Sequence, residues 1–195
     1  MLKKIFLTSI TLLTMASLTA CGDSAEPADA KLPAPSGRSA ILETDLGDIE
    51  IGFYENEVPE MAKNFIELAK AGKYDNTPFH RVVKDFVIQG GDFTNRSGTG
   101  GYSYKGPGTE LAGEFHPSLS NLRGSLSWAN KGPDTNGSQF FINLKDNSNL
   151  DHDKAPLTSQ HPVFAVVTKG MKVVEKIVNA GKTVNIVKVT LGEKQ

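Results

Sequence analysis

Short apolar segments alternate with polar turns along most of this chain, and the clearest pair lies near residue 45. Residues 40–44 and 49–53 each alternate partly between apolar and polar side chains, and Asp45-Leu46-Gly47-Asp48 stands between them. Because glycine permits the backbone of a tight turn, this pattern predicts a β-hairpin that covers a core with one face.

Two segments carry apolar residues at helical spacing instead. Residues 59–70 place Met61, Phe65, Leu68 and Ala69 on one face, with a proline at the start and a glycine just past the end. Proline is favoured in the first turn of a helix and glycine just after its last turn. This pattern predicts an amphipathic helix.

The second segment with helical spacing lies near the end of the domain. Residues 172–180 have Val174, Ile177 and Val178 at helical spacing, and Gly181 is placed to end the helix. Residues 184–191 then alternate, which predicts a closing strand.

Residues 40–191 contain no internal repeat or second linker, so we expect one domain. About 150 residues suffice to bury roughly 68–70% of the surface of the unfolded chain. Many short strands, two helices and abundant Gly and Asn turns predict a mainly β fold. The pattern alone leaves a barrel and a sandwich as alternatives.

The first 20 residues have the plan of an export signal. Lys3 and Lys4 precede an apolar run over residues 5–18, and small residues follow. Such a run is shorter than a membrane-spanning helix requires. Leu18-Thr19-Ala20-Cys21 resembles a bacterial lipobox, which implies cleavage before Cys21 and lipid on its thiol; the alternative is an ordinary secretory signal with a chance cysteine. We expect an exported protein anchored at the periplasmic side of the outer membrane in a Gram-negative host, and otherwise at the outer face of the cell membrane.

Residues 22–39 are rich in Ala, Pro, Asp, Glu and Ser, so residues 21–39 are predicted to be a lipidated tether and residues 40–192 the folded domain. Cys21 is the only cysteine, which excludes a disulfide or a zinc-cysteine site within one chain. Loss of residues 1–20 leaves 19 basic and 22 acidic residues, which does not favour nucleic-acid binding.

Two blocks carry the candidate chemistry. The first runs from Phe79-His80-Arg81 to Gln89-Gly90-Gly91-Asp92, and the second from Ser127-Trp128-Ala129-Asn130 to Gln139-Phe140-Phe141-Ile142. Together they closely resemble the active-site signature of cyclophilins, the peptidyl-prolyl cis/trans isomerases. The resemblance covers nearly all of residues 40–191 and implies an eight-stranded closed antiparallel β-barrel capped by two α-helices.

The resemblance also implies roles for particular residues. It makes Arg81, Phe86 and Gln89 catalytic, and it implies no cofactor and no metal. The positions that it assigns to substrate binding are Val87, Ala129, Asn130, Gln139, Phe141, Leu150 and His161. Proline-containing polypeptides are the implied partners, and we expect a monomer that assists protein folding.

The chemistry fits the residue types. An X-Pro amide isomerises over a barrier of about 18–20 kcal/mol because the nitrogen lone pair is delocalised. When the amide twists, the prolyl nitrogen regains its lone pair, so a fixed donor stabilises the transition state more than the ground state. The Arg81 guanidinium is a rigid, charged donor of this kind.

Each residue also has a plainer interpretation. Phe86, Val87 and Phe141 are typical of a core, Arg81 of an exposed strand, and Gln89 of a turn. Only the joint occurrence of these residues, in this order along two extended blocks, favours an active site. The rival function is a peptide-binding module or chaperone with incidental turnover.

Three other sequence patterns give weaker evidence of a functional site. Gly181-Lys182-Thr183 resembles the end of a phosphate loop, but Lys176 stands where its first glycine is required. Asp151-His152-Asp153 lacks the spacing of a metal site, and residues 98–108 are predicted to be a mobile surface loop. Asn149 stands where many cyclophilins carry a tryptophan, which argues against cyclosporin binding.

Overall fold

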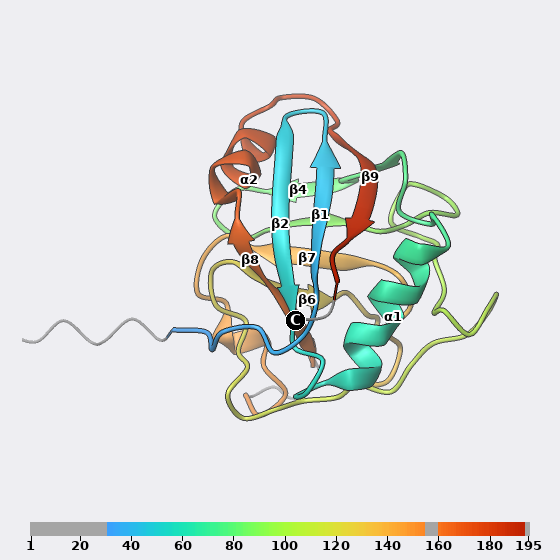
Figure 1. The fold of residues 1–195 in the computed structure, drawn as a ribbon, viewed down its shortest axis with the longest axis vertical. Helices are drawn as coiled ribbons and strands as arrows, with labels where there is room; N and C mark the ends of the chain where they lie inside the picture. The colour runs from blue at the N-terminus through green and yellow to red at the C-terminus, as the bar shows by residue number, and fades with distance from the viewer. Residues whose placement is uncertain (1–30, 155–159, 194–195) are drawn as a thin grey trace, which may run out of the picture.

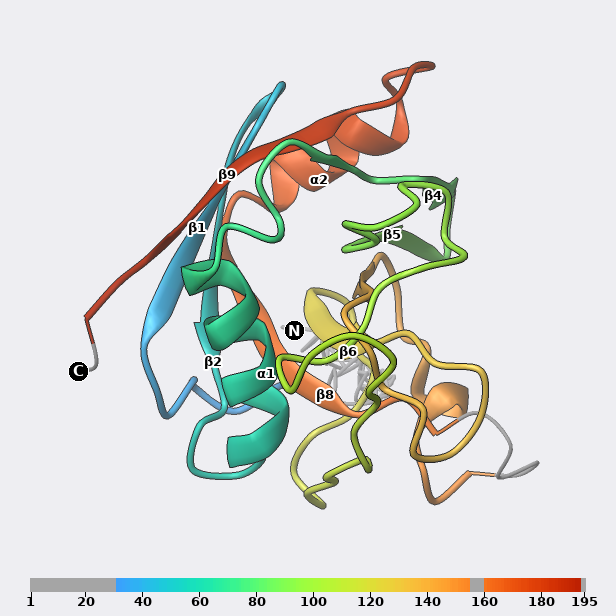
Figure 2. The same ribbon diagram turned by 90° about the vertical axis from the view of Figure 1, so that its right-hand side faces the viewer.

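The computed structural model describes residues 31–154 and 160–193, which form a curled antiparallel sheet and two α-helices (Figures 1 and 2). The predicted signal at residues 1–20 and the lipidation site Cys21 lie outside the described residues. In chain order the elements are β1 (Ser39–Thr44), β2 (Gly47–Phe53), α1 (Pro59–Lys70), β3 (Thr77–Pro78), β4 (Arg81–Val83), β5 (Val87–Gly90), β6 (Ser125–Trp128), β7 (Phe140–Asn143), a 3-10 turn (Ser148–Leu150), β8 (Val163–Lys169), α2 (Met171–Val178) and β9 (Asn185–Leu191).

The local elements follow the hydrophobic pattern closely. The predicted hairpin is confirmed, with Thr44 paired to Gly47 across its turn. The first predicted helix has the observed bounds of α1. The second helix begins at Met171 and ends at Val178, two residues before the predicted end, because the backbone of Asn179 leaves helical geometry, with φ of −96° and ψ of 4°.

The mainly β class and the two helices are confirmed, but the described residues contain nine strands instead of eight. Their order in the sheet is β3-β9-β1-β2-β8-β6-β7-β5-β4. The two end strands, β3 and β4, are separated in sequence only by Phe79 and His80, so residues 77–83 form one segment that pairs with β9 first and with β5 afterwards. Among the described residues, no ladder joins β3 to β4. The two ends of the sheet are therefore joined by the covalent chain of this segment instead of by hydrogen bonds between strands. Because the segment is divided into β3 and β4, the sheet has nine strands where eight were predicted.

Aromatic side chains fill the space between α1 and the sheet. The Phe65 ring of α1 lies 4.6 Å from that of Tyr74 and 5.3 Å from that of Phe140, while Trp128 stacks on Phe164 at 4.6 Å. All five side chains are buried. Burial of a large apolar side chain contributes roughly 1.5–3 kcal/mol, so this cluster accounts for much of the attachment of α1. Helix α2 lies away from α1, against β2 and β4 (Figure 1).

Contacts between the N-terminal segment and the domain begin at Pro33, before the predicted start of the domain at residue 40. The Tyr54 hydroxyl donates a hydrogen bond to the Pro33 carbonyl over 3.0 Å, and the N–H groups of Ser36 and Gly37 donate to the Phe53 carbonyl. Arg38 forms an ion pair with Glu55. The assignment of residues 33–38 to a free tether is therefore wrong, because these hydrogen bonds hold the segment on the domain without large apolar side chains.

No helix in the described part of the chain is long and apolar enough to cross a membrane.

Candidate functional site

Three neighbouring strands place the candidate catalytic residues side by side. In the ladder, Arg81 of β4 faces Gln89 of β5, and Gln89 faces Phe141 of β7. Because side chains alternate along a strand, Val87, Gln89 and Phe141 point to one face of the sheet while Ile88 points to the other. Ile88 belongs to the main core cluster, whereas Val87 and Phe141 are buried outside it. The plainer interpretation of these two residues as main core is therefore wrong.

A tight turn brings Phe86 beneath the arginine. Asp85 has a positive φ of 57°, and the Phe86 N–H donates to the Val83 carbonyl over 3.1 Å. The Arg81 guanidinium carbon consequently lies 5.7 Å from the centre of the Phe86 ring. Cation–π contact restricts the guanidinium to one side of the strand while leaving its N–H groups accessible.

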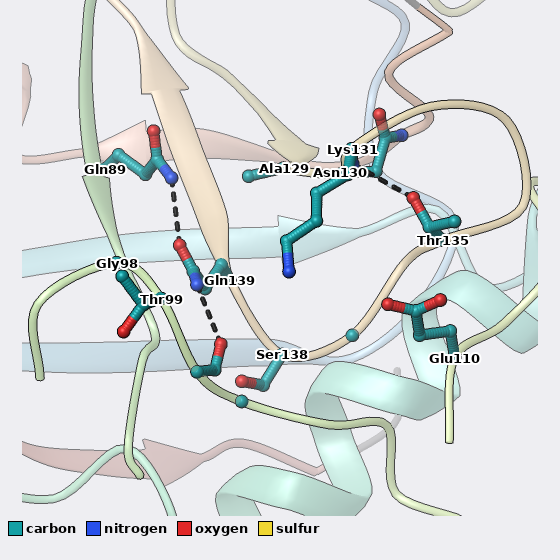
Figure 3. A pocket seen from close by; sticks show the side chains of 13 residues that line it. Gln89, Gly98, Thr99, Glu110, Ala129, Asn130, Lys131, Thr135, Ser138 and Gln139 are labelled. Atoms are coloured by element: carbon teal, nitrogen blue, oxygen red, sulfur yellow. Dashed lines mark hydrogen bonds between the residues drawn. The ribbon is translucent and has the colours of Figure 1, made fainter. Parts of the chain in front are cut away.

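A chain of hydrogen bonds extends from Arg81 across the site. Arg81 Nη1 donates to Gln89 Oε1 over 3.4 Å, and Gln89 Nε2 donates to Gln139 Oε1 over 3.0 Å. Gln139 Nε2 in turn donates to the Gly100 carbonyl over 2.7 Å (Figure 3). Each amide is thereby held in one orientation. The first bond is long, so the guanidinium retains donor capacity for a substrate.

The apolar side of the site is formed by Phe141 and His161. Their rings meet edge to face at 5.3 Å, and His161 Nδ1 donates to the Trp128 carbonyl over 2.9 Å. Burial lowers the pKa of His161 below its ordinary value, against a smaller raising effect of the hydrogen bond to Trp128. The neutral ring is therefore favoured, as an apolar wall requires.

The turn that carries Leu150 is tied to the same region. Asn147 Nδ2 donates to the Phe86 carbonyl over 3.0 Å, and the Leu150 N–H donates to the Asn147 carbonyl over 2.8 Å. The His161 N–H donates to the Leu150 carbonyl over 3.2 Å. Asn147 thus links the strand turn at Phe86 to the turn that ends at Leu150.

A pocket of about 130 Å³ opens beside these residues (Figure 3). Four of the predicted substrate-contacting residues line it, namely Gln89, Ala129, Asn130 and Gln139. Asn130 is fixed by hydrogen bonds from its Nδ2 to Asn136 Oδ1 and to the Gln160 carbonyl. Arg81, Phe86, Val87, Phe141, Leu150 and His161 do not line this pocket. The predicted site residues therefore divide between the pocket and the neighbouring apolar surface.

Sequence reasoning missed the remaining lining residues. The pocket is also lined by Gly98, Thr99, Gly100, Gly101, Glu110, Lys131, Thr135, Gly137 and Ser138. Lys131 and Glu110 project into it from different loops (Figure 3). A signal was present, because the glycine-rich stretch begins at Gly98, six residues after Asp92, and glycines permit close approach of a backbone to a ligand.

The pocket loop is held by one buried carboxylate. Asp92 Oδ2 accepts hydrogen bonds from the N–H groups of Ser97, Gly98 and Gly100 at 3.2, 2.8 and 3.0 Å, and Oδ1 accepts from Thr94 and Asn95. Burial by itself raises the pKa of Asp92, but these backbone donors outweigh burial and hold it far below its usual value. The predicted mobile loop is thus tied in place where it borders the pocket.

Within the described residues, no group of three or more His, Cys, Asp or Glu side chains is arranged to hold a metal ion. The carboxylate of Asp151 instead accepts hydrogen bonds from Ser120 and Asn121, and the His152 ring stacks on Phe115.

Comparison with known proteins gives a consistent answer. Residues 40–191 match the sequence model of the family described as cyclophilin type peptidyl-prolyl cis-trans isomerase/CLD. The chain is 46% identical over 138 residues to the peptidyl-prolyl cis-trans isomerase-like 1 of Rhizopus delemar, which covers 70% of this chain and 78% of the relative. It is 40% identical over 146 residues to the peptidyl-prolyl cis-trans isomerase CYP18-2 of Arabidopsis thaliana, covering 74% of this chain and 83% of that protein.

Solved structures agree with the sequence relatives. The crystal structure of a cyclophilin type peptidyl-prolyl cis-trans isomerase from Cryptosporidium parvum matches with a TM-score of 0.72 and 30% identity, and covers 80% of this chain and 98% of that chain. The same isomerase in the presence of the dipeptide Ala-Pro matches with a TM-score of 0.70. The chain therefore belongs to the cyclophilin family and is a cyclophilin-type peptidyl-prolyl cis-trans isomerase.

Proposed function

We propose that this isomerase accelerates rotation about X-Pro bonds of exported proteins, with Arg81 as the donor to the prolyl nitrogen. The single observation that carries the assignment of Arg81 is its placement. It lies over the Phe86 ring, opposite Gln89 in the ladder, with its first hydrogen bond as long as 3.4 Å. A charged donor held in this way stabilises the twisted amide, in which the nitrogen lone pair is localised.

One hydrogen bond does not account for the catalysis. Shortening an uncatalysed time of ~100 s to ~1 ms requires about 7 kcal/mol, whereas a hydrogen bond to a charged group contributes about 1.5–3 kcal/mol. The rest is assigned to binding that holds the proline ring while the preceding carbonyl rotates. Phe141 and His161 offer the apolar surface for the ring, and Gln89, Asn130 and Gln139 offer fixed amides for the peptide backbone.

The relative from Cryptosporidium parvum was crystallised in the presence of Ala-Pro, which supports proline-containing peptides as ligands of this chain. We extend the same proposal to the natural substrates. They are polypeptides that have crossed the cytoplasmic membrane, because Lys3, Lys4 and the apolar run before Cys21 have the plan of a lipoprotein signal. Acyl chains on Cys21 then hold the enzyme at the membrane, since each buried CH2 contributes about 0.8 kcal/mol.

The enzymatic proposal is tested by isomerisation of a short X-Pro peptide with the mature chain, its Arg81→Ala variant and Arg123→Ala as the matched control. Arg123 is exposed and pairs with Glu175. We expect acceleration by wild type and by Arg123→Ala, and at least a tenfold loss in Arg81→Ala. Equal activity of all three proteins contradicts the role of Arg81. Peptide binding without acceleration by folded wild type favours the peptide-binding module instead.

The anchor is tested separately in cells that process lipoproteins. The wild-type chain is expected in the membrane fraction, and Cys21→Ser without its acyl chains in the soluble fraction. Unchanged membrane association of Cys21→Ser, with no lipid found on the wild-type thiol, overturns the anchor.

A further inference from the structure

Three adjoining hollows form one continuous surface around α2, away from the substrate pocket. They measure about 600, 670 and 200 Å³. Glu175 and Asn179 line both the first and the third, while Arg123 and Leu144 line both the second and the third. We call this surface the basic face. Its charged residues are Lys31, Lys84, Asp85, Arg123, Lys145, Asp146, Lys172, Glu175, Lys176 and Lys182.

The charge of the basic face differs from that of the whole protein. It carries seven of the 21 Lys and Arg residues of the chain but three of the 22 Asp and Glu residues. One acidic residue is already neutralised, because Arg123 Nη2 lies 2.6 Å from Glu175 Oε1. The six lysines of the face are exposed and form no ion pair within 4 Å among residues 31–154 and 160–193. Unpaired cations gathered on one side create a local positive potential although the formal net charge is −1.

Apolar side chains line the same hollows as these cations. Leu32, Leu122, Leu144 and Val166 line the second hollow together with Lys31, Arg123 and Lys145. Leu46 and Ala180 line the first hollow beside the lysines of α2. A surface that mixes exposed lysines with apolar side chains suits the boundary between headgroups and acyl chains of a bilayer.

The described N-terminal segment begins at this same surface. Lys31 and Leu32 line the second hollow, and the described N-terminal segment leaves the body on the side of α2 and β8 (Figure 1). Ten peptide units separate Cys21 from Lys31. Even fully extended they span at most about 35 Å. An anchored Cys21 therefore keeps the basic face close to the membrane.

We propose that the basic face lies against an anionic phospholipid bilayer and orients the enzyme on it. This proposal rests on the anchor of the proposed function for its membrane, but the charge pattern stands by itself. Each Lys or Arg of a polybasic surface that lies near anionic headgroups adds to the attraction between that surface and the bilayer. The overall acidic balance of the chain disfavours nucleic acid as the occupant.

Docking in this way sets the position of the active site. Strand β4 begins at Arg81, and the turn that follows it carries Lys84 of the basic face. The catalytic edge of the sheet therefore borders the bilayer while the pocket lined by Gln89 and Gln139 stays open to solvent. We expect the oriented enzyme to meet polypeptides as they leave the membrane.

The test uses the chain from residue 21 onward with Cys21→Ser, so that no acyl chain contributes. Binding is measured by flotation with vesicles that contain about 30 mol% phosphatidylglycerol in phosphatidylcholine, at about 50 mM salt. The Lys172→Gln/Lys176→Gln/Lys182→Gln variant is compared with Lys70→Gln/Lys73→Gln/Lys188→Gln, which removes the same charge from the α1 and β9 side. A second face variant, Lys84→Gln/Lys145→Gln, guards against misfolding of the first, and thermal unfolding of each protein is recorded.

We expect wild type and the control to bind anionic vesicles, both face variants to partition at least tenfold more weakly, and about 0.5 M salt to release the protein. The proposal is overturned if wild type does not bind anionic vesicles, or binds pure phosphatidylcholine vesicles equally well. It is also overturned if the control variant loses as much vesicle binding as the face variants, or if wild type binds a DNA duplex more tightly than vesicles. Peptide isomerisation in solution is measured on the same proteins and is expected to be unchanged. In wild type, absent vesicle binding with intact isomerisation rejects the basic face alone, whereas absent isomerisation with intact vesicle binding rejects the catalytic proposal alone.

Discussion

Arg81 and Gln89 face each other across the β4–β5 ladder, and Arg81 Nη1 donates to Gln89 Oε1 over 3.4 Å. This bond is too long to occupy the guanidinium fully, and the Phe86 ring at 5.7 Å limits where the guanidinium can move. The arginine is therefore guided by its neighbours and still has donors to offer a substrate.

Substitution of Arg81 by lysine tests whether the planar fork matters beyond its charge. Lysine keeps one positive charge but has neither the rigid fork nor the flat surface that stacks on Phe86. We expect kcat/KM for an X-Pro peptide to fall about 10- to 100-fold, while peptide Kd changes less than tenfold. Arg123→Lys is the control and should keep wild-type turnover. Wild-type turnover in Arg81→Lys contradicts the assigned role.

The Gln89–Gln139 hydrogen bond should act as a unit with the arginine. Gln89→Leu and Gln139→Leu each break the chain that runs from Arg81 to the Gly100 carbonyl. Because residues in one network do not contribute additively, we expect the double variant to lose little more activity than either single variant. A double-mutant cycle on kcat/KM measures this coupling. Losses that simply add show that the two amides act independently.

Asp92 should stabilise the pocket loop through its backbone hydrogen bonds. In Asp92→Asn, an amide N–H2 replaces an oxygen that accepts from backbone donors, so we expect a loss of about 1–3 kcal/mol in the free energy of unfolding. Asp134→Asn is the matched control, because Asp134 accepts one backbone bond at an exposed site. Denaturant unfolding measures both variants, and equal stabilities contradict the importance of the Asp92 network.

The same carboxylate makes a contribution to stability that depends on pH. Its pKa is lower in the folded protein than in the unfolded chain, so the unfolded state binds the proton first as pH falls. The stabilisation is present above the ordinary Asp value of about 3.9 and is lost as pH falls from there toward the lower folded value. The difference in stability between wild type and Asp92→Asn should therefore shrink in acid. A difference that is constant down to about pH 2 contradicts this linkage.

Alanine substitution at two glycines with positive φ separates the effect of backbone strain from the effect of a steric clash. A Cβ on Gly98, with φ of 93°, meets Cδ2 of His80 at 2.9 Å, whereas a Cβ on Gly106, with φ of 117°, meets nothing within 4 Å. Both alanine variants should lose stability, and Gly98→Ala should lose more, with reduced activity as its loop borders the pocket. Thermal unfolding and kcat/KM of the two variants test this. Equal losses of stability and activity in the two variants show that the His80 side chain moves away from the added Cβ at little cost.

Activity should depend little on pH above about pH 6.5. Burial lowers the pKa of His161, so its ring is neutral over this range, and arginine stays charged. The lowered value has a stability consequence, because the unfolded chain takes up a proton first as pH falls below about 6.5 and the folded state loses stability there. We expect kcat/KM to be flat from about pH 6.5 to 8.5. A steep step in that range that persists in His161→Asn contradicts both assignments.

Several features of the site were predictable from residue order, and others were not. Arg81, Gln89 and Phe141 belong to two recognisable sequence blocks, and the structure places them in adjacent register. Lys131 and Glu110 were missed because they carry no local signal and line one pocket only because separate loops approach it. The contact of residues 33–38 with the domain was also missed, because it depends on hydrogen bonds to Tyr54 and Phe53 rather than on apolar burial.

The local elements could be read from the amino-acid sequence, because the period of apolar side chains and the positions of Gly and Pro act within a few residues. The hairpin, α1 and the closing strand follow from these short-range preferences. Two features emerge only in the folded chain: residues 77–83 change partner from β9 to β5, and Asp92 holds the pocket loop through hydrogen bonds to its backbone. Long-range pairing of this kind depends on which groups meet after the chain has curled, and the local pattern does not encode that choice.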